Sequence, residues 1–202
     1  MAWYDINVEV KEVEANKEYL QKIKYDEIIC KKTKNFTDII GEDLPENIQY
    51  RFVTEMAFNA IIVIEYLLQK YELEAIYIAV YRMNQLSVSR LKTIIDKSDV
   101  ECHILLSSFF RENKRYEKWC EDLMMYSRSK ENVKIVFANN HAKVFLAKTK
   151  CNKYICFEGS GNLADNGRIE QYLLENNKTT FDFHKEWITN TIDIQYVRRK
   201  RK

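Results

Sequence analysis

The feature that most constrains the fold is a series of apolar, β-branched runs separated by helical patterns in the middle of the chain. Residues 75–81, 100–106 and 133–137 are predicted as buried strands, whereas residues 86–97 and 111–130 have the pattern of helices. This alternation is typical of right-handed crossovers in a layered α/β domain. We therefore expect a sheet with ligands outside the carboxyl ends of its strands.

The chain on either side of this alternation completes the predicted sheet. Residues 54–71 have one polar stripe on an otherwise apolar helix, which indicates a helix packed on the sheet. Residues 144–149 and 154–157 are predicted as a hairpin around a polar turn. A strand at residues 172–174 and a closing helix at residues 181–192 follow.

The N-terminal segment is predicted as a small β-rich extension. Apolar and polar residues nearly alternate at residues 6–13, and residues 25–30 are predicted as a second short strand. Gly41 and Pro45, the one proline of the chain, mark a loop before the main domain. The predicted divisions are an accessory segment at residues 1–48, a main domain at residues 49–195 and a basic tail at residues 196–202.

Composition limits the classes of protein to consider. With 46% hydrophobic residues among 202, the chain can bury a core and form one domain with additions. A formal net charge of +2 gives no overall field that favours nucleic acid. The N-terminus has no signal-peptide pattern and no apolar run reaches the length of a membrane span, so we expect a soluble, cytoplasmic protein. The five cysteines have no CxxC spacing and form no ligand cluster with histidine, so no metal site is expected.

The residues with the clearest chemical pattern follow the last predicted parallel strand. His141 and Lys143 are two apart, so a strand would project both side chains from one face. The predicted hairpin then returns the chain to Gly159, Ser160, Gly161 and Asn162. Hydroxyl, amide and backbone N–H donors in such a sequence suit the oxygens of a phosphate. The functional interpretation of these residues is an anion-binding site that contains an imidazole. The structural interpretation is that His141 is a polar residue at the end of a strand and that residues 159–162 form an ordinary turn.

These residues resemble the motif of the phospholipase D superfamily: His-x-Lys, four residues, Asp, then Gly-Ser-x-Asn. Here the motif stands as His141-Ala-Lys143 and Gly159-Ser160-Gly161-Asn162, and Glu170 fits the acid that hydrogen-bonds the histidine in that family. One residue departs from the pattern, because Lys148 stands where the family has Asp. The resemblance spans about residues 50–192 and implies a layered sheet with helices on both faces, making residues 49–195 a catalytic domain.

The resemblance also implies a mechanism of phosphoryl transfer with no metal or cofactor. His141 would attack phosphorus and form a phosphohistidine, which water hydrolyses. Lys143 and Asn162 would stabilise the charge on the phosphate oxygens, and Glu170 would hold the imidazole. The substrate-binding residues implied alongside them are Ser160, Gly159, Gly161 and Arg168.

A single histidine cannot both carry the phosphoryl group and protonate the leaving oxygen. Neither His103 nor His184 belongs to a second His-x-Lys, and both are interpreted as structural. Family membership would therefore require a homodimer, in which two copies of His141 meet at one phosphate.

Among phosphodiester substrates we favour nucleic acid, and DNA over RNA. The predicted activity is therefore that of an endonuclease. Cations near the motif and in the tail would track a phosphate backbone; they are Lys148, Lys150, Lys153, Arg168 and residues 198–202. The tail is equally well interpreted as a solvated end, and Arg82 as a cleft residue or a surface ion pair. Two alternatives stay open: a noncatalytic module that binds nucleic acid or protein, and a lipid phosphodiesterase.

Overall fold

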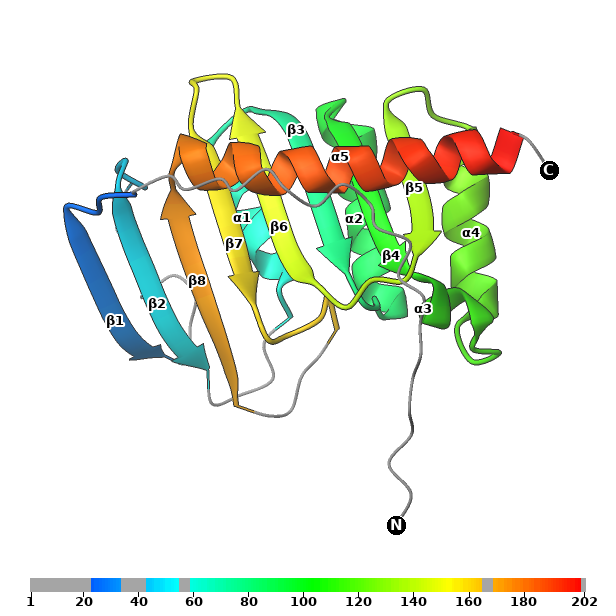
Figure 1. Cartoon of the computed structure of the whole chain (residues 1–202), viewed down its shortest axis with the longest axis horizontal. Helices are drawn as coiled ribbons and strands as arrows, with labels where there is room; N and C mark the ends of the chain where they lie inside the picture. Colours follow the sequence, from blue (N-terminus) through cyan, green and yellow to red (C-terminus); the bar gives the residue numbers. More distant parts are fainter. Residues whose placement is uncertain (1–22, 34–42, 55–58, 165–168, 201–202) are drawn as a thin grey trace, which may run out of the picture.

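The computed structural model describes residues 23–33, 43–54, 59–164 and 169–200. These residues form an eight-stranded mixed sheet with helices on both faces, in the strand order β1-β2-β8-β7-β6-β3-β4-β5 (Figure 1). The strands are β1 Glu27–Thr33, β2 Ile48–Thr54, β3 Leu73–Val80, β4 Glu101–Ser107, β5 Val133–Ala138, β6 Lys143–Thr149, β7 Tyr154–Gly159 and β8 Glu170–Asn176. The helices are α1 Ile61–Lys70, α2 Gln85–Ser98, α3 Ser108–Glu112, α4 Glu117–Arg128 and α5 Lys178–Lys200.

The predicted parallel strands form one half of the sheet. β3, β4 and β5 pair in parallel, and the crossovers between them carry α2 and then α3 with α4. Their central side chains are almost wholly buried, because both faces of this half are covered by helices. The predicted α/β fold class is therefore confirmed.

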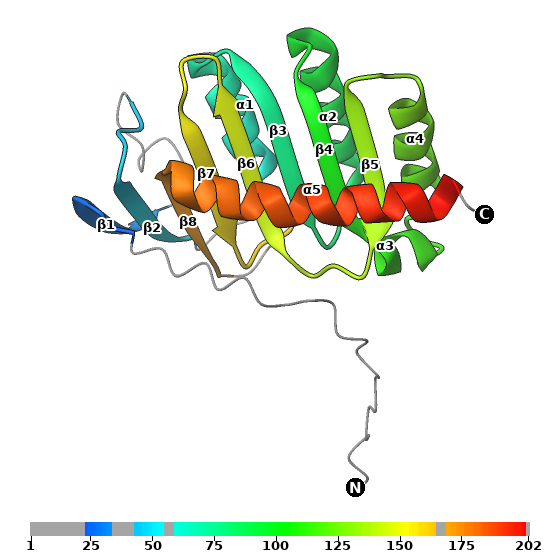
Figure 2. The same cartoon turned by 45° about the horizontal axis from the view of Figure 1, so that its top comes forward.

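Two apolar cores hold the layers together. One lies between the sheet and α1, α2 and α4, with Ile78, Ile104 and Phe145 among its residues. The other lies beneath α5, where Phe181 and Ile188 pack on the opposite face. Figure 2 shows α5 running across that face from β8 towards β5, with α1, α2 and α4 behind the sheet. In the described part of the chain, α5 begins above β8 and does not extend over β1 and β2 (Figure 1).

The other half of the sheet is largely antiparallel. β6 pairs with β3 and β7, β7 pairs with β8, and β8 pairs with β2, all antiparallel. The predicted hairpin is thus β6 and β7. The predicted strand at residues 25–30 is β1, which pairs in parallel with β2 and extends the main sheet. The strand predicted at residues 6–13 lies outside the described residues.

Two predicted helix boundaries were wrong. Thr54 ends β2 instead of starting a helix, and α1 begins at Ile61. Tyr50, Phe52 and Thr54 are buried while Arg51 and Val53 are exposed, an alternation that belongs to a strand with one covered face. The helix predicted at residues 111–130 is divided into α3 and α4, which are separated at residues 113–116.

The strand directions bring several chain segments to one edge of the sheet. β3, β4, β5 and β7 end there, whereas β6 and β8 begin there, at the lower edge in Figure 1. His141, Ser160 and Glu170 are therefore all placed at this edge, which we call the carboxyl edge. In the described part of the chain, no helix is both long and apolar enough to cross a membrane.

Candidate active site

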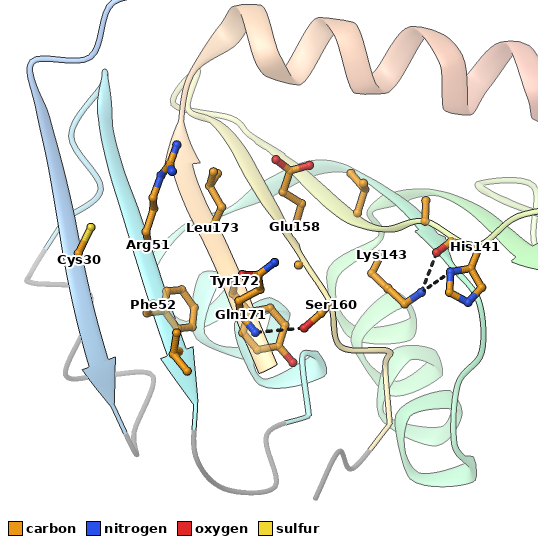
Figure 3. Close-up of a pocket in the computed structure, with 14 residues that line it drawn as sticks. Cys30, Arg51, Phe52, His141, Lys143, Glu158, Ser160, Gln171, Tyr172 and Leu173 are labelled. Atoms are coloured by element: carbon orange, nitrogen blue, oxygen red, sulfur yellow. Dashed lines mark hydrogen bonds between the residues drawn. The ribbon is translucent and has the colours of Figure 1, made fainter. Parts of the chain in front are cut away.

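His141 and Lys143 are in direct contact at the carboxyl edge. His141 lies in the link between β5 and β6, and Lys143 is the first residue of β6. Lys143 Nζ lies 3.0 Å from His141 Nδ1 and donates a hydrogen bond to the His141 carbonyl oxygen at 2.7 Å (Figure 3). A charged ammonium has only protons to give, so Nδ1 acts as the acceptor and a neutral ring carries its proton on Nε2.

Lys143 is partly withdrawn from solvent, and this burial lowers the pKa of its ammonium from the ordinary lysine value. The negative charge of Glu170 acts in the opposite direction and keeps part of the lost basicity. A cation with a reduced hydration shell gains more from a phosphate oxygen than a fully solvated lysine does.

A buried asparagine fixes the link that carries the histidine. Asn140 Nδ2 donates to the carbonyl oxygens of Val80, at 3.2 Å, and Leu105, at 3.1 Å, near the ends of β3 and β4. Asn140 Oδ1 accepts from the N–H of Ala142 at 2.9 Å. One side chain thus joins β3, β4 and the β5–β6 link, and it fixes the backbone on either side of His141.

Ser160 is locked between the ends of β7 and β8. Its N–H donates to the Gln171 carbonyl at 3.0 Å, and its Oγ accepts from the Gln171 N–H at 3.1 Å. The Ser160 hydroxyl also hydrogen-bonds the carboxylate of Glu170. Glu170 therefore orients Ser160 in the single chain, and the bond expected from Glu170 to His141 is not formed there among the described contacts.

Gly159 permits this close approach of the two strands. A Cβ at this position would lie 2.3 Å from the Gln171 carbonyl oxygen and 2.4 Å from Cδ1 of Tyr172, both far inside contact distance. The glycine is thus required by the packing of β7 on β8. Among the described glycines none has a positive φ, so backbone handedness is not the reason.

Asn162 is positioned by the segment that follows β3. Its Oδ1 accepts from the N–H of Arg82 at 3.3 Å, and its carbonyl accepts from Ala164 at 2.8 Å. The neighbouring Leu163 forms a bridge with Met83, which fixes the loop after buried Gly161 against the end of β3. The side chain of Arg82 donates to the Tyr116 hydroxyl at 3.1 Å, which is neither of the roles considered for it from sequence.

A groove of about 1090 Å³ extends from His141 and Lys143 along the part of the α5 face of the sheet that α5 does not cover. Figure 3 shows it passing from β6 over β7 and β8 to β2 and β1, with the Arg51 side chain near the far end. Its labelled lining residues are Cys30, Arg51, Phe52, His141, Lys143, Glu158, Ser160, Gln171, Tyr172 and Leu173. Sequence analysis did not predict Arg51, Glu158 and Gln171 as residues of the site. For Arg51, the alternation of buried and exposed residues along β2 was the one signal that could have placed its side chain on the exposed face.

The other histidines are engaged away from His141. His103 Nε2 lies 2.7 Å from Glu101, and its ring stacks on Tyr77. His184 Nε2 lies 3.4 Å from Glu158, and the hydrogen bond from His184 lowers the pKa of that carboxyl group. Within the described ranges, no three His, Cys, Asp or Glu side chains gather where they would hold a metal ion.

The residue that departs from the motif lies far from the phosphate donors. Lys148 is near the other end of β6 and forms an ion pair with Glu74 at 2.6 Å. The Lys148 side chain therefore pairs near the opposite edge of the sheet, away from the carboxyl edge. Arg168 lies outside the described residues, as do residues 201–202 and the side chains of residues 198–200.

Comparison with models of known protein families gives no match, and comparison with curated proteins gives none either. Solved structures do match. Nuc from Salmonella typhimurium, described as a phospholipase D family member, aligns with a TM-score of 0.50 and 12% identity over 66% of this chain and 86% of that chain. NucT from Helicobacter pylori aligns with a TM-score of 0.51 and 15% identity, over 73% of this chain and 97% of that chain. The archaeal chromatin protein TrmBL2 aligns with a TM-score of 0.50 and 11% identity, over 70% of this chain and 51% of that chain.

These identities are low, so the likeness concerns the backbone. The backbone of this chain follows that of Nuc over 66% of its length and that of NucT over 73%. The chain therefore has a phospholipase D-like fold.

Proposed function

We propose that the chain is a metal-independent phosphodiesterase, and most simply a nuclease, that acts through a phosphohistidine at a site shared by two protomers. The observation that carries this proposal is the contact of the Lys143 ammonium with the His141 imidazole at the carboxyl edge. A nucleophile and a cation are there within reach of one phosphate, beside the fixed Ser160.

In the proposed reaction, a substrate phosphate replaces His141 as the acceptor for Lys143. The unprotonated imidazole nitrogen attacks phosphorus, so a P–N bond forms while the P–O bond to the leaving oxygen breaks. The partner's His141 starts this step as an imidazolium, gives one proton to the leaving oxygen and becomes a neutral imidazole. Water then attacks the phosphohistidine, returns a proton to the partner's His141 and breaks the P–N bond.

The negative charge that develops on the phosphoryl oxygens requires donors that are already oriented. Lys143 supplies the cation, and Ser160 and Asn162 supply neutral polar groups. Glu170 orients Ser160 within its own protomer. Its predicted contact with an imidazole in the assembled dimer stays a prediction.

Nucleic acid is the proposed substrate, with DNA preferred. The groove gives an extended chain a path from His141 to Arg51. The fold is shared with Nuc, NucT and a chromatin protein whose structure is described as showing a novel mode of DNA binding. That last likeness also favours a second candidate, a module that binds DNA without cleaving it.

Cleavage of labelled single- and double-stranded DNA and RNA in EDTA tests the proposal. Loss of the nucleophile in His141→Ala should lower the rate by about 10⁴-fold or more, and Lys143→Met should lower it by roughly 10²- to 10³-fold. Lys130→Met is the matched control, because Lys130 precedes β5 at the edge of the sheet opposite the candidate site and pairs there with Asp96 at 2.7 Å. It should cleave at the wild-type rate.

The outcomes separate the candidate functions. Cleavage that depends on added divalent metal, or that persists in His141→Ala, would overturn the phosphohistidine mechanism. Binding of DNA by both proteins without cleavage would establish the noncatalytic module. Cleavage of a lipid phosphodiester but of no nucleic acid would keep the phosphohistidine mechanism and replace the proposed substrate.

A further inference from the structure

Three aromatic rings form a row that leads away from the candidate nucleophile. The ring of Tyr81 lies 4.7 Å from the His141 ring, centroid to centroid, and Phe109 stacks on Tyr81 at 5.6 Å with 19° between the planes. Tyr81 follows β3, and Phe109 is in α3 directly after β4. The row therefore lies on the carboxyl edge and extends from His141 away from the groove.

Phe109 ends this row as an exposed ring. Its side chain is 53% exposed, whereas the next residue, Phe110, is 1% exposed and belongs to the core. The orientation is fixed locally, because the N–H of Phe109 donates to Ser107 Oγ at 3.3 Å and its carbonyl accepts from Asn113 at 3.2 Å. Scattered exposed apolar side chains are common, but a stacked pair that begins at the reactive imidazole forms a defined surface for a flat ligand.

The same segment carries positive charge. Residues 108–116 contain three cations and one acid, and the cations are exposed. They are Arg111, Lys114 and Arg115. On the inner side of the row, Lys143 Nζ lies 5.8 Å from the centroid of the Tyr81 ring. Aromatic rings among cations beside a phosphate site match the two needs of a single strand, which are stacking for its bases and charge for its backbone.

We propose that Tyr81 and Phe109 form a stacking platform for an unpaired nucleobase next to the scissile phosphate, so that single-stranded nucleic acid is the substrate class. This inference rests on the proposed function and names its substrate. A base has a free face for Phe109 only when it is unstacked from its neighbours, which a duplex prevents. The phosphate bound by Lys143 and the base on Phe109 are then held at the same time.

Binding to an inactive protein measures the platform apart from catalysis. In a His141→Asn background, fluorescence anisotropy compares a labelled oligothymidylate with an abasic oligonucleotide of the same length. Phe109→Ala should weaken oligothymidylate binding by roughly 5- to 100-fold and leave abasic binding unchanged, whereas Phe109→Trp should retain it. Phe183→Ala is the control, because Phe183 is 48% exposed on α5 and should behave as the parent.

Cleavage gives a second readout in the protein with His141 intact. Phe109→Ala should raise KM for single-stranded DNA, while slow cleavage of duplex DNA stays at its starting level. Equal binding of oligothymidylate by Phe109→Ala and its parent would overturn the platform and leave the phosphodiesterase proposal standing. So would a change of particle mass by light scattering in Phe109→Ala, since the ring would then belong to a subunit interface.

Failure of the proposed function looks different from failure of the platform. If the wild type cleaves nothing but the oligonucleotide binds through Phe109, the platform stands on a noncatalytic protein. If neither oligonucleotide nor duplex is bound or cleaved in any form, both the function and the platform are overturned.

Discussion

At the scale of residues, Lys143 and His141 are placed to act on one phosphate. The Lys143 ammonium lies 3.0 Å from Nδ1 of His141. Burial lowers the pKa of Lys143, while the charge of Glu170 raises it. A candidate nucleophile and a cation therefore meet at one point of the carboxyl edge.

This pairing predicts the alkaline side of the pH profile. Because burial lowers the pKa of Lys143 below the ordinary lysine value of about 10.4, the charge that binds phosphate is lost at a lower pH than on a surface lysine. We expect kcat/KM to fall as pH rises through that lowered pKa. Lys143→Arg should be slower at neutral pH, since its fork differs in shape, but its alkaline fall should move to higher pH. An unchanged alkaline limb in Lys143→Arg would assign the limb to another group.

Asn140 allows a test of positioning as distinct from stability. Asn140→Ala removes the bonds to Val80, Leu105 and Ala142, which should cost about 1–3 kcal/mol in the free energy of unfolding and roughly 10²-fold in kcat through displacement of His141. Asn132→Ala is the control, because Asn132 bonds the Val100 carbonyl at the opposite edge of the sheet. Urea unfolding and cleavage rates of both variants decide the matter. Equal losses of kcat would contradict a positioning role for Asn140.

At the scale of elements, the pairing of β7 with β8 builds the second half of the site. Gly159 faces Tyr172 in this register, and the next residues, Ser160 and Gln171, bond each other. Glu170 reaches Ser160 because it begins β8 at the same edge. Small changes in the spacing of these two strands therefore move the phosphate donors directly.

Gly159→Ala makes this dependence measurable. The added methyl group would lie 2.3 Å from a backbone oxygen, so the strands must separate, and overpacking of this kind costs about 1–3 kcal/mol. We expect a lower Tm together with a loss of cleavage larger than the loss of stability explains, because Ser160 moves with the strand. If the variant has the wild-type Tm and activity, β8 can move enough to accommodate the methyl group without disturbing Ser160, and the prediction is wrong.

The sequence predicted local elements well and long-range neighbours poorly. Periodicity identified β3 to β5 and the β6–β7 hairpin, because each apolar pattern reflects burial on its own element. The partner of Glu170 depended on the register of β7 with β8, and the place of Arg51 in the groove depended on β2 pairing with a strand far along the chain. Phe109 and Phe110 are identical adjacent residues, so only the fold decides which is exposed.

At the scale of the whole molecule, one polar cluster joins three distant segments. Asp43 precedes β2 and hydrogen-bonds the hydroxyl of Tyr71 after α1, and it also pairs at 3.0 Å with Lys153 of the β6–β7 turn. The hydrogen bonds that Tyr71 and Lys153 donate to the carboxylate lower the pKa of Asp43 from 3.8 to about 2. The unfolded chain therefore binds the proton more readily than the folded one between these values.

Acid unfolding should show this cluster. A depressed carboxyl pKa stabilises the fold above pH 3.8, and this stability is lost as pH falls towards 2. Asp43→Asn should be less stable than the wild type at neutral pH, and the difference should shrink in that acid window. Urea unfolding at a series of pH values measures it. A constant difference at all pH values would attribute the effect to lost packing instead of to the ionised carboxylate.

The shared site makes the sharpest prediction for the assembled molecule. If two copies of His141 serve one phosphate, a dimer of one wild-type and one His141→Ala protomer lacks either the nucleophile or the acid. When differently tagged chains are co-refolded in equal amounts, activity per wild-type chain should fall to about half, and total activity to about a quarter of that of an all-wild-type sample. Lys130→Met chains mixed in the same way should leave activity unchanged, with the mass checked by light scattering. Total activity near half would mean that each protomer is complete, and the proton of the leaving group would then have to come from within one chain.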